Sequence, residues 1–433
     1  MQPDIRLDRN IIAVQVDQVV HVLVDLVAPA APPSDRAPID LVLVLDRSGS
    51  MSGDPLRSVR EAAAKVLRSV GPDDRVAVVA FDDQVTLVLP LVHHADTDQA
   101  AAAVRSIHSG GSTNLSAGWF KALELLDGSP RPHAVRRIVL LTDGHANAGL
   151  RDIEQLGPIV RAGRDRGITT SCIGFADGYD ERFLAGVADS GGGDDYWCAG
   201  PDQANDVFTA ELGVLANLVA QNVSVEIRPT PAVAAAEVLN DFPVVEVPGG
   251  RQVSLGDAMG GERRRVVTKF HLRPASAQGD VHVADLVIRW VSMVGDPELH
   301  TVTVPVRLTA GDGEVVIDAG VTEEVVRLQI ASERRAAQET ADRGDHRGAS
   351  ELLRRAAEAA RPYPALRNEV DMLNIDSALL ADGLWSETKR KESHARSRGI
   401  SKRRRKDYSS DHEPSIQPDI DPDDQSPSGQ SPT

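Results

Sequence analysis

The chain has 433 residues, of which 41% are hydrophobic and 26% are charged, a composition typical of globular protein and too apolar for wholesale disorder. The 47 Lys and Arg residues against 64 Asp and Glu residues give a formal net charge of -17, which repels nucleic acid and anionic lipid over most of the surface. At about 150 residues per domain, the length predicts roughly three structural units.

The sequence gives no sign of membrane insertion or secretion. Its apolar runs are far shorter than the roughly 20 residues that a bilayer-spanning helix needs. The first residues, MQPDIRLDRN, are polar and lack the features of a signal peptide. Cys172 and Cys198 are too few for a disulfide framework and have neither CxxC nor zinc-finger spacing. We therefore expect a cytoplasmic protein with two buried free thiols.

Residues 1–38 alternate in the strand period and end in the linker APAAPPSDRAP, which predicts a short β segment. From 39 to 220, apolar strands alternate with amphipathic helices, which is typical of βαβ units around a mostly parallel sheet. We expect strands at 39–45, 75–81, 136–142, 168–175 and 195–198, and helices behind Pro55 and at 97–108, 115–126, 151–166, 180–188 and 202–219.

The strand period returns in residues 221–320, with Pro and Gly between the runs, and this pattern predicts an antiparallel β-sandwich. Because residues 1–38 have the same character and cannot bury a face alone, we expect them to complete this sandwich. The α/β domain at 39–220 is then an insertion within a β domain, or a domain that the sandwich follows.

The C-terminal part is predicted to be helical and then disordered. Residues 321–388 are rich in Ala, Leu, Arg and Glu and favour a helical hairpin; a single tetratricopeptide-like repeat is the alternative. Residues 389–433 form a tail that begins with a basic stretch at 389–406, with ten basic residues and one Glu, and continues with seven acidic residues. We expect both halves of this tail to be disordered.

Three polar loops are expected at one edge of the parallel sheet. Asp46, Ser48 and Ser50 follow the first strand of the α/β domain, and Thr113 lies in the loop Gly-Gly-Ser-Thr-Asn. Asp143 directly follows the third strand. Ligands of such sheets bind at the carboxyl ends of the strands. Carboxylate and hydroxyl oxygens are the donors that Mg²⁺, Mn²⁺ or Ca²⁺ prefer. The local alternative is that the serines cap a helix and that Asp143 makes a turn.

With these residues the sequence resembles the von Willebrand factor type A (VWA) family, whose metal-ion-dependent adhesion site has the pattern DxSxS, a distant Thr and a distant Asp. The resemblance covers about 39–220 and extends to bacterial proteins that carry this domain beside a β-sandwich. It implies that Ser48, Ser50 and Thr113 contact the metal, and that Asp46 and Asp143 hold it largely through water. The open position then takes a Glu or Asp of a partner protein. Mg²⁺ is the expected cation, with Mn²⁺ and Ca²⁺ as alternatives.

We therefore predict a non-catalytic, metal-dependent protein-binding module, a scaffold or regulator in a cytoplasmic assembly. Family analogy suggests an AAA+ ATPase or a stress-response complex as the partner. The motifs GxxxxGK[ST], HExxH and GxSxG are missing from the sequence. One alternative is a metal-dependent phosphohydrolase, although Ser48 stands where its DxD motif would have the second carboxylate. The other alternative is nucleic-acid or acidic-partner binding through residues 389–406.

Overall fold

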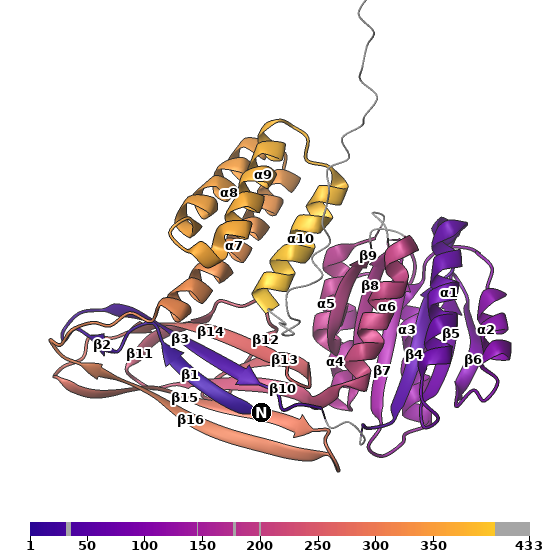
Figure 1. The fold of residues 1–433 in the computed structure, drawn as a ribbon, viewed down its shortest axis with the longest axis horizontal. Coiled ribbons are helices and arrows are strands. Elements are labelled where there is room, and N and C mark those ends of the chain that lie inside the picture. The colour runs from indigo at the N-terminus through magenta and orange to yellow at the C-terminus, as the bar shows by residue number, and fades with distance from the viewer. Residues whose placement is uncertain (32–35, 145, 176–178, 199–200, 403–433) are drawn as a thin grey trace, which may run out of the picture.

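The computed structural model describes residues 1–31, 36–144, 146–175, 179–198 and 201–402. Figure 1 shows three units in this part of the chain: an α/β unit, a two-sheet unit, and a group of helices above the junction of the other two. None of the helices in these ranges has the length and apolar character needed to cross a bilayer.

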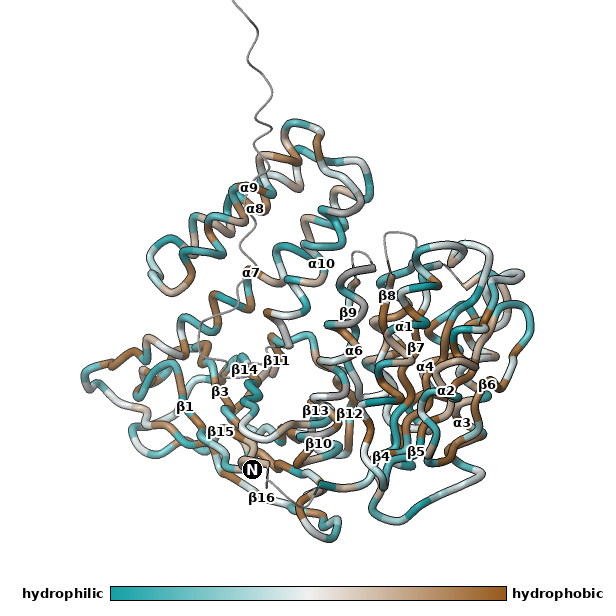
Figure 2. Tube along the Cα trace, turned by 45° about the vertical axis from the view of Figure 1, so that its right-hand side comes forward, coloured by the Kyte–Doolittle hydropathy of each residue, from teal (hydrophilic) through white to brown (hydrophobic). Residues whose placement is uncertain are grey.

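The α/β unit is built on a six-stranded sheet. Its strands are β4 (Ile39–Asp46), β5 (Arg75–Phe81), β6 (Val85–Val92), β7 (Val135–Thr142), β8 (Ile168–Phe175) and β9 (Gly192–Cys198). Their order is β6-β5-β4-β7-β8-β9, and neighbours are parallel except β5 and β6. Hydrophobic stretches run along these strands in Figure 2, because both faces of the sheet are covered.

Helices cover both faces of this sheet. They are α1 (Asp54–Ser69), α2 (Thr97–Arg105), α3 (Leu115–Gly128), α4 (Ile153–Asp165), α5 (Glu181–Gly191) and α6 (Pro201–Ala216). Val59 of α1 and Phe208 of α6 share a core with Leu43, together with side chains of α2. Trp119 of α3 packs with Val44 on the opposite face, together with side chains of α4 and α5. The predicted doubly wound α/β fold is confirmed, and the edge strand β6 is an element that the sequence pattern did not reveal.

The two-sheet unit combines strands that come before the α/β unit in the sequence with strands that come after it. One sheet has the order β1 (Gln2–Leu7), β3 (Gln18–Val27), β14 (Arg263–Leu272), β11 (Val233–Val238). The other has the order β12 (Val244–Val247), β13 (Gly250–Met259), β10 (Leu218–Pro229), β15 (Gly279–Ser292), β16 (Glu298–Ala310), β2 (Ile11–Ile12). Neighbouring strands are antiparallel except β16 and β2, and side chains of both sheets form one apolar core. The chain thus leaves this unit after β3 and returns to it at β10.

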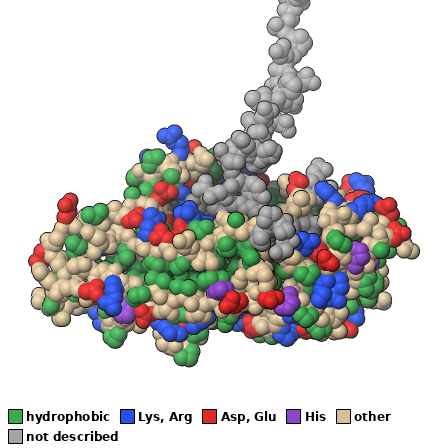
Figure 3. Space-filling view, turned by 60° about the horizontal axis from the view of Figure 1, so that its bottom comes forward, with side chains coloured by type: hydrophobic (Ala, Val, Ile, Leu, Met, Phe, Trp, Pro, Cys, Tyr) green, Lys and Arg blue, Asp and Glu red, His purple; other side chains and the backbone are tan. Residues whose placement is uncertain are grey.

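Hydrophobic side chains also gather in a band on one face of the molecule. Figure 3 shows this band over the two-sheet unit, with charged side chains mostly around it. The core of this unit is flanked by partly buried apolar side chains, among them Ile5, Leu7 and Val302. The two sheets therefore do not cover their apolar interior completely.

The C-terminal helices are α7 (Ala319–Asp342), α8 (His346–Ala360), α9 (Arg367–Ala381) and α10 (Glu387–Lys402), with a 3-10 turn at Pro364–Leu366. Apolar side chains of α7, α8 and α9 form a separate core that contains Ile330, Leu353 and Leu373. The helical region predicted for 321–388 is therefore larger than a hairpin. Figure 1 shows α10 between this bundle and the α/β unit.

The prediction of disorder from residue 389 onward is wrong for residues 389–402, which belong to α10. Charge runs stay disordered when no surface neutralises them, and here acidic groups of the α/β unit do so. Arg390 pairs with Glu181, and Arg398 pairs with Asp195. These arginines are turned toward protein, which weakens the alternative of nucleic-acid binding through 389–406. The rest of the predicted tail, 403–433, lies outside the described residues.

Candidate metal centre

The candidate site lies where β4 and β7 end. These two strands are parallel neighbours, with Leu45 opposite Leu141, so the residues that follow them meet at one edge of the sheet. The chain after β4 makes a short 3-10 turn, Gly49–Met51, and the loop before α3 lies against it. The Gly49 amide donates to the Gly111 carbonyl over 3.0 Å, and the Gly110 amide donates to the Arg47 carbonyl over 2.7 Å.

Asp46 is fully buried at the end of β4. Its Oδ1 accepts a hydrogen bond from the Ser48 amide at 2.7 Å, and its Oδ2 accepts one from the Thr142 hydroxyl at 2.5 Å. Burial raises the pKa of Asp46 to about 6, and the nearby charge of Asp143 acts in the same direction. Both donors are neutral, so the carboxylate has a fixed orientation without a compensating charge from them.

Ser48, Ser50 and Asp143 form a chain of hydrogen bonds. The two serine hydroxyls are 3.2 Å apart, and the Ser50 hydroxyl donates to Asp143 Oδ1 at 2.8 Å. Ser48 and Asp143 are buried, whereas Ser50 is exposed. Burial also raises the pKa of Asp143. The cluster therefore opens to solvent at Ser50.

Thr113 joins the same cluster from the loop before α3. The Thr113 side chain is buried, and its amide donates to Asn147 Oδ1 at 2.7 Å. A Cβ atom placed on Gly144 would lie 3.5 Å from the Ser50 hydroxyl and 3.8 Å from the Thr113 hydroxyl. Both hydroxyls thus flank one point beside Gly144. All five predicted side chains lie at this edge of the sheet.

The structure also reveals three supporting residues that the sequence pattern missed: Asp82, Thr142 and Asn147. Asp82 accepts a hydrogen bond from the Gly111 amide at 3.3 Å and pairs with Arg47 at 3.2 Å, which fixes the two loops. The position of Asp82 directly after β5 was the available signal, because β5 ends at the same sheet edge.

The donors at this site fit a hard divalent cation. They are oxygens throughout, from two carboxyl groups and three hydroxyl groups, as Mg²⁺, Mn²⁺ and Ca²⁺ prefer. Within the described ranges, neither Asp46 nor Asp143 forms an ion pair with a basic side chain. The same ranges contain no cluster of three or more His, Cys, Asp and Glu side chains suited to a metal ion. A bound cation would supply the positive charge that the two buried carboxyl groups lack.

Comparison with known protein families gives an independent view of this unit. Residues 40–208 match the family model of the von Willebrand factor type A domain. An uncharacterized protein of Synechocystis, sll0103, is 25% identical over 75% of this chain and 79% of its own length. YfbK of Escherichia coli is 28% identical over 48% of this chain, and the E3 ubiquitin-protein ligase WAV3 of Arabidopsis thaliana is 30% identical over 57%. This chain covers only 37% of YfbK and 32% of WAV3.

Two solved structures share the fold over most of the chain. A von Willebrand factor type A protein from Catenulispora acidiphila superposes with a TM-score of 0.70 at 18% identity, over 86% of this chain and 89% of its own. The ArnB paralog VWA2 from Sulfolobus acidocaldarius superposes with a TM-score of 0.61 at 17% identity, over 92% and 98%. At these identities the likeness shows the fold alone. Taken with the sheet order and the family match, residues 40–208 form a von Willebrand factor type A domain.

Proposed function

We propose that this protein binds a partner protein through a divalent cation held on its VWA domain by Asp46, Ser48, Ser50, Thr113 and Asp143. VWA domains commonly mediate metal-dependent protein–protein interaction. The observation that carries the proposal is the pair of buried carboxyl groups for which the described residues supply no basic partner, next to a hydroxyl that faces solvent.

Some residues of the site orient the carboxyl groups that would bind the cation, and others leave the cation accessible to a partner. Thr142 and the Ser48 amide orient Asp46, and Ser50 orients Asp143. The hydroxyls add neutral donors, so a cation held here keeps more of its charge than it would among carboxylates alone. When bound, the cation supplies an electrophilic centre that a carboxylate oxygen of a partner can reach from the solvent side. Residues 108–112 are exposed beside it and leave room for that partner.

The proposed cation is Mg²⁺, with Mn²⁺ and Ca²⁺ as alternatives, and the proposed role is binding and not catalysis. The residue two positions after Asp46 is Ser48, whose hydroxyl is engaged with Ser50. Ser48 thus stands where a DxD motif would have its second carboxylate, and this favours binding over phosphoryl transfer. The compartment and the assembly in which the protein acts stay predictions of the sequence.

Cation binding tests the first half of this proposal. Mn²⁺ binding to the full chain is measured by electron paramagnetic resonance and calorimetry, for wild type, Asp46→Asn and Asp143→Asn. We expect each variant to bind at least about tenfold more weakly, because it loses a charged donor. Asp73→Asn, an exposed carboxyl group before β5 at the opposite edge of the sheet, is the matched control and is expected to bind like wild type. Equal affinity in all four proteins would reject the site.

Partner capture tests the second half. The tagged full chain is used as bait in a lysate of the source organism in four conditions: wild type with Mg²⁺, wild type with EDTA, Asp46→Asn with Mg²⁺, and Asp73→Asn with Mg²⁺. We expect a set of proteins that wild type and Asp73→Asn retain in Mg²⁺ and that the other two conditions lose. Identical sets in every condition would show that partners dock elsewhere on the molecule.

A further inference from the structure

Helix α10 is held between the VWA domain and the helical bundle by an unusually polar interface. Its buried side chains include Lys391, Ser393, Ser397 and Arg398, with Ile400 as the buried apolar contribution in the described part of the helix. On the bundle side, the Ser397 hydroxyl donates to the Ala331 carbonyl at 2.8 Å. A 16-residue helix of this composition has little stability by itself, so its contacts decide whether it stays folded.

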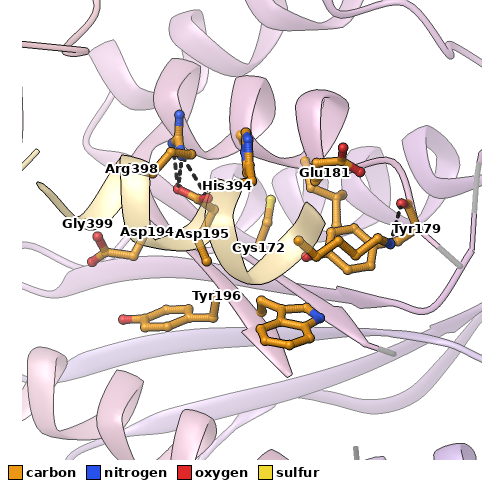
Figure 4. A pocket seen from close by; sticks show the side chains of 14 residues that line it. Cys172, Tyr179, Glu181, Asp194, Asp195, Tyr196, His394, Arg398 and Gly399 are labelled. Carbon is orange, nitrogen blue, oxygen red and sulfur yellow. Dashed lines mark hydrogen bonds and ion pairs between the residues drawn. The ribbon is translucent and has the colours of Figure 1, made fainter. Parts of the chain in front are cut away.

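The contacts of α10 with the VWA domain are mainly ionic. Arg398 donates to Asp189 Oδ1 at 2.9 Å and to Asp195 Oδ1 at 2.5 Å, and Arg390 pairs with Glu181. Figure 4 shows Arg398 directed at the carboxylate of Asp195 on the neighbouring strand β9. These pairs are partly buried, so the attraction between the charges is offset in part by the hydration that they lose.

The fit between α10 and the VWA domain is also incomplete. A cavity of about 210 Å³ lies between them, lined by Cys172, Tyr179, Trp197 and His394 among others. Burial lowers the pKa of His394, and its Nε2 atom has no hydrogen-bond partner among the described residues. Protein interiors normally pack without voids of this size. The interface between α10 and the VWA domain is therefore not closely packed along its whole length.

One contact connects α10 to the end of the VWA sheet. The buried Lys391 ammonium donates to the Tyr179 carbonyl at 3.1 Å and lies 4.1 Å from the centre of the Tyr179 ring. That ring lies directly on Gly174 of β8, since a Cβ atom there would come within 2.2 Å of it. Docked α10 thus holds Tyr179 against the C-terminal end of β8.

The end of β8 borders the candidate metal centre. Gly174 is paired with Thr142 of β7, and the Thr142 hydroxyl is the donor that orients Asp46. A continuous series of contacts therefore runs from Lys391 through Tyr179, Gly174 and Thr142 to Asp46.

We propose that α10 is a releasable latch, and that its docked state keeps the candidate metal centre in its binding arrangement through Lys391, Tyr179 and Thr142. This inference rests on the proposed function, because it assigns a regulatory element to the same site. Two states are involved, with α10 docked or released, and the cation binds more tightly when α10 is docked. By linkage, a cation that prefers the docked state must also favour docking by the same factor.

Hydrogen exchange on the wild-type full chain tests this reciprocity. Amide exchange of residues 389–402 is measured with EDTA and with saturating Mn²⁺, after calorimetry has established that Mn²⁺ binds. We expect exchange in α10 to slow by about fivefold or more, the lower end of typical coupling between sites. Unchanged exchange in a protein that binds Mn²⁺ would overturn the latch and leave the proposed function standing. A wild-type protein that fails to bind Mn²⁺ would reject the proposed function and the latch with it.

Release of the latch by mutation is the complementary test. Arg398→Glu places a negative charge beside Asp189 and Asp195 and is expected to speed α10 exchange and weaken Mn²⁺ binding about fivefold. Arg354→Glu makes the same charge change on α8, where Arg354 pairs with Glu351 and Glu358, and is expected to bind Mn²⁺ like wild type. Equal Mn²⁺ affinity in the two variants, with α10 released in Arg398→Glu, would contradict the inference.

Lys391→Met provides a second variant in case Arg398→Glu does not fold. It keeps the length of the side chain and removes the ammonium group that contacts the carbonyl and the ring of Tyr179. We expect weaker Mn²⁺ binding with an unchanged circular dichroism spectrum. Wild-type Mn²⁺ affinity in this variant would overturn the role assigned to Lys391.

Discussion

The buried carboxyl group of Asp46, a predicted metal ligand, lowers the stability of the folded protein when it is ionised. The residue is fully buried, and its hydrogen-bond donors, the Ser48 amide and the Thr142 hydroxyl, carry no charge. The ionised carboxylate therefore loses its hydration without gaining a countercharge from the described part of the chain, and this loss raises its pKa from 3.8 to about 6. Between these two pH values the native state holds a proton that the unfolded state releases. Stability consequently falls as the pH rises from about 4 to about 6, and the full cost persists above that range.

Asp46→Asn should therefore stabilise the metal-free protein. The amide has the same shape, carries no charge, and can still accept the hydrogen bond from the Ser48 amide. In EDTA at pH 7.5 we expect the free energy of unfolding in urea to rise by about 1–3 kcal/mol. The gain should shrink as the pH falls from 6 toward 4, where wild-type Asp46 becomes protonated as well. Asp73→Asn should show no such gain. If the gain in the free energy of unfolding of Asp46→Asn did not change with pH, ionisation of Asp46 would not be its cause.

The five predicted donor residues were visible in the sequence because their spacing is local within each loop and the loops follow predicted strands. The structure brings the five side chains to one sheet edge, while their role as metal ligands stays a prediction. Thr142 and Asn147 were not predicted as partners of Asp46 and Thr113. Their contacts depend on the register between β4 and β7 and on the path of the loop after β7, which no short motif encodes.

At the level of elements, long apolar strands and amphipathic helices were predictable, and an edge strand and a polar helix were not. β6 contains Pro90 and has exposed residues on one face, as edge strands do, so its pattern is weak. α10 has almost no apolar periodicity, because it packs through charges onto Glu181, Asp189 and Asp195. Its helical state depends on packing against α7 and on acidic residues of the VWA domain, both far away in the sequence, which composition alone cannot reveal.

Limited proteolysis distinguishes a docked α10 from a disordered basic segment. Trypsin cleaves after Lys and Arg in unfolded backbone, so a disordered segment should be cut rapidly after Arg390 and Lys391. We expect slow cleavage at both positions in wild type and at least about tenfold faster cleavage in Arg398→Glu, because protection follows the docked population. Arg354→Glu serves again as the control, and trypsin should cleave it at these positions as slowly as it cleaves wild type. Rapid cleavage of wild type at Arg390 would contradict the docked helix.

At the scale of the whole molecule, side-chain contacts join the VWA domain to the two-sheet unit, in addition to the two covalent connections between them. Arg137 of β7 is 1% exposed and lies between Glu211 of α6 and Asp257 of β13, with N–O distances of 3.5 and 3.4 Å. Ser171 and Tyr196 each donate to Glu211 at 2.7 Å. This buried network joins a strand and a helix of the VWA domain to a strand of the two-sheet unit, so the two units should unfold together.

Arg137→Met tests this coupling. The substitution fills part of the space but leaves Asp257 and Glu211 buried without the guanidinium between them, and breaking a buried pair in this way typically costs about 3–5 kcal/mol. We expect a loss of about that size in urea and, in calorimetry, separation of one unfolding transition into two. Arg136→Met is the matched control, because Arg136 is half-buried on the same strand and donates to the Arg166 carbonyl at the surface. It should cost less than about 1 kcal/mol and keep one transition. If Arg137→Met behaved like Arg136→Met, the network would not be what holds the two units together, and their coupling would have to come from the apolar contacts at the junction.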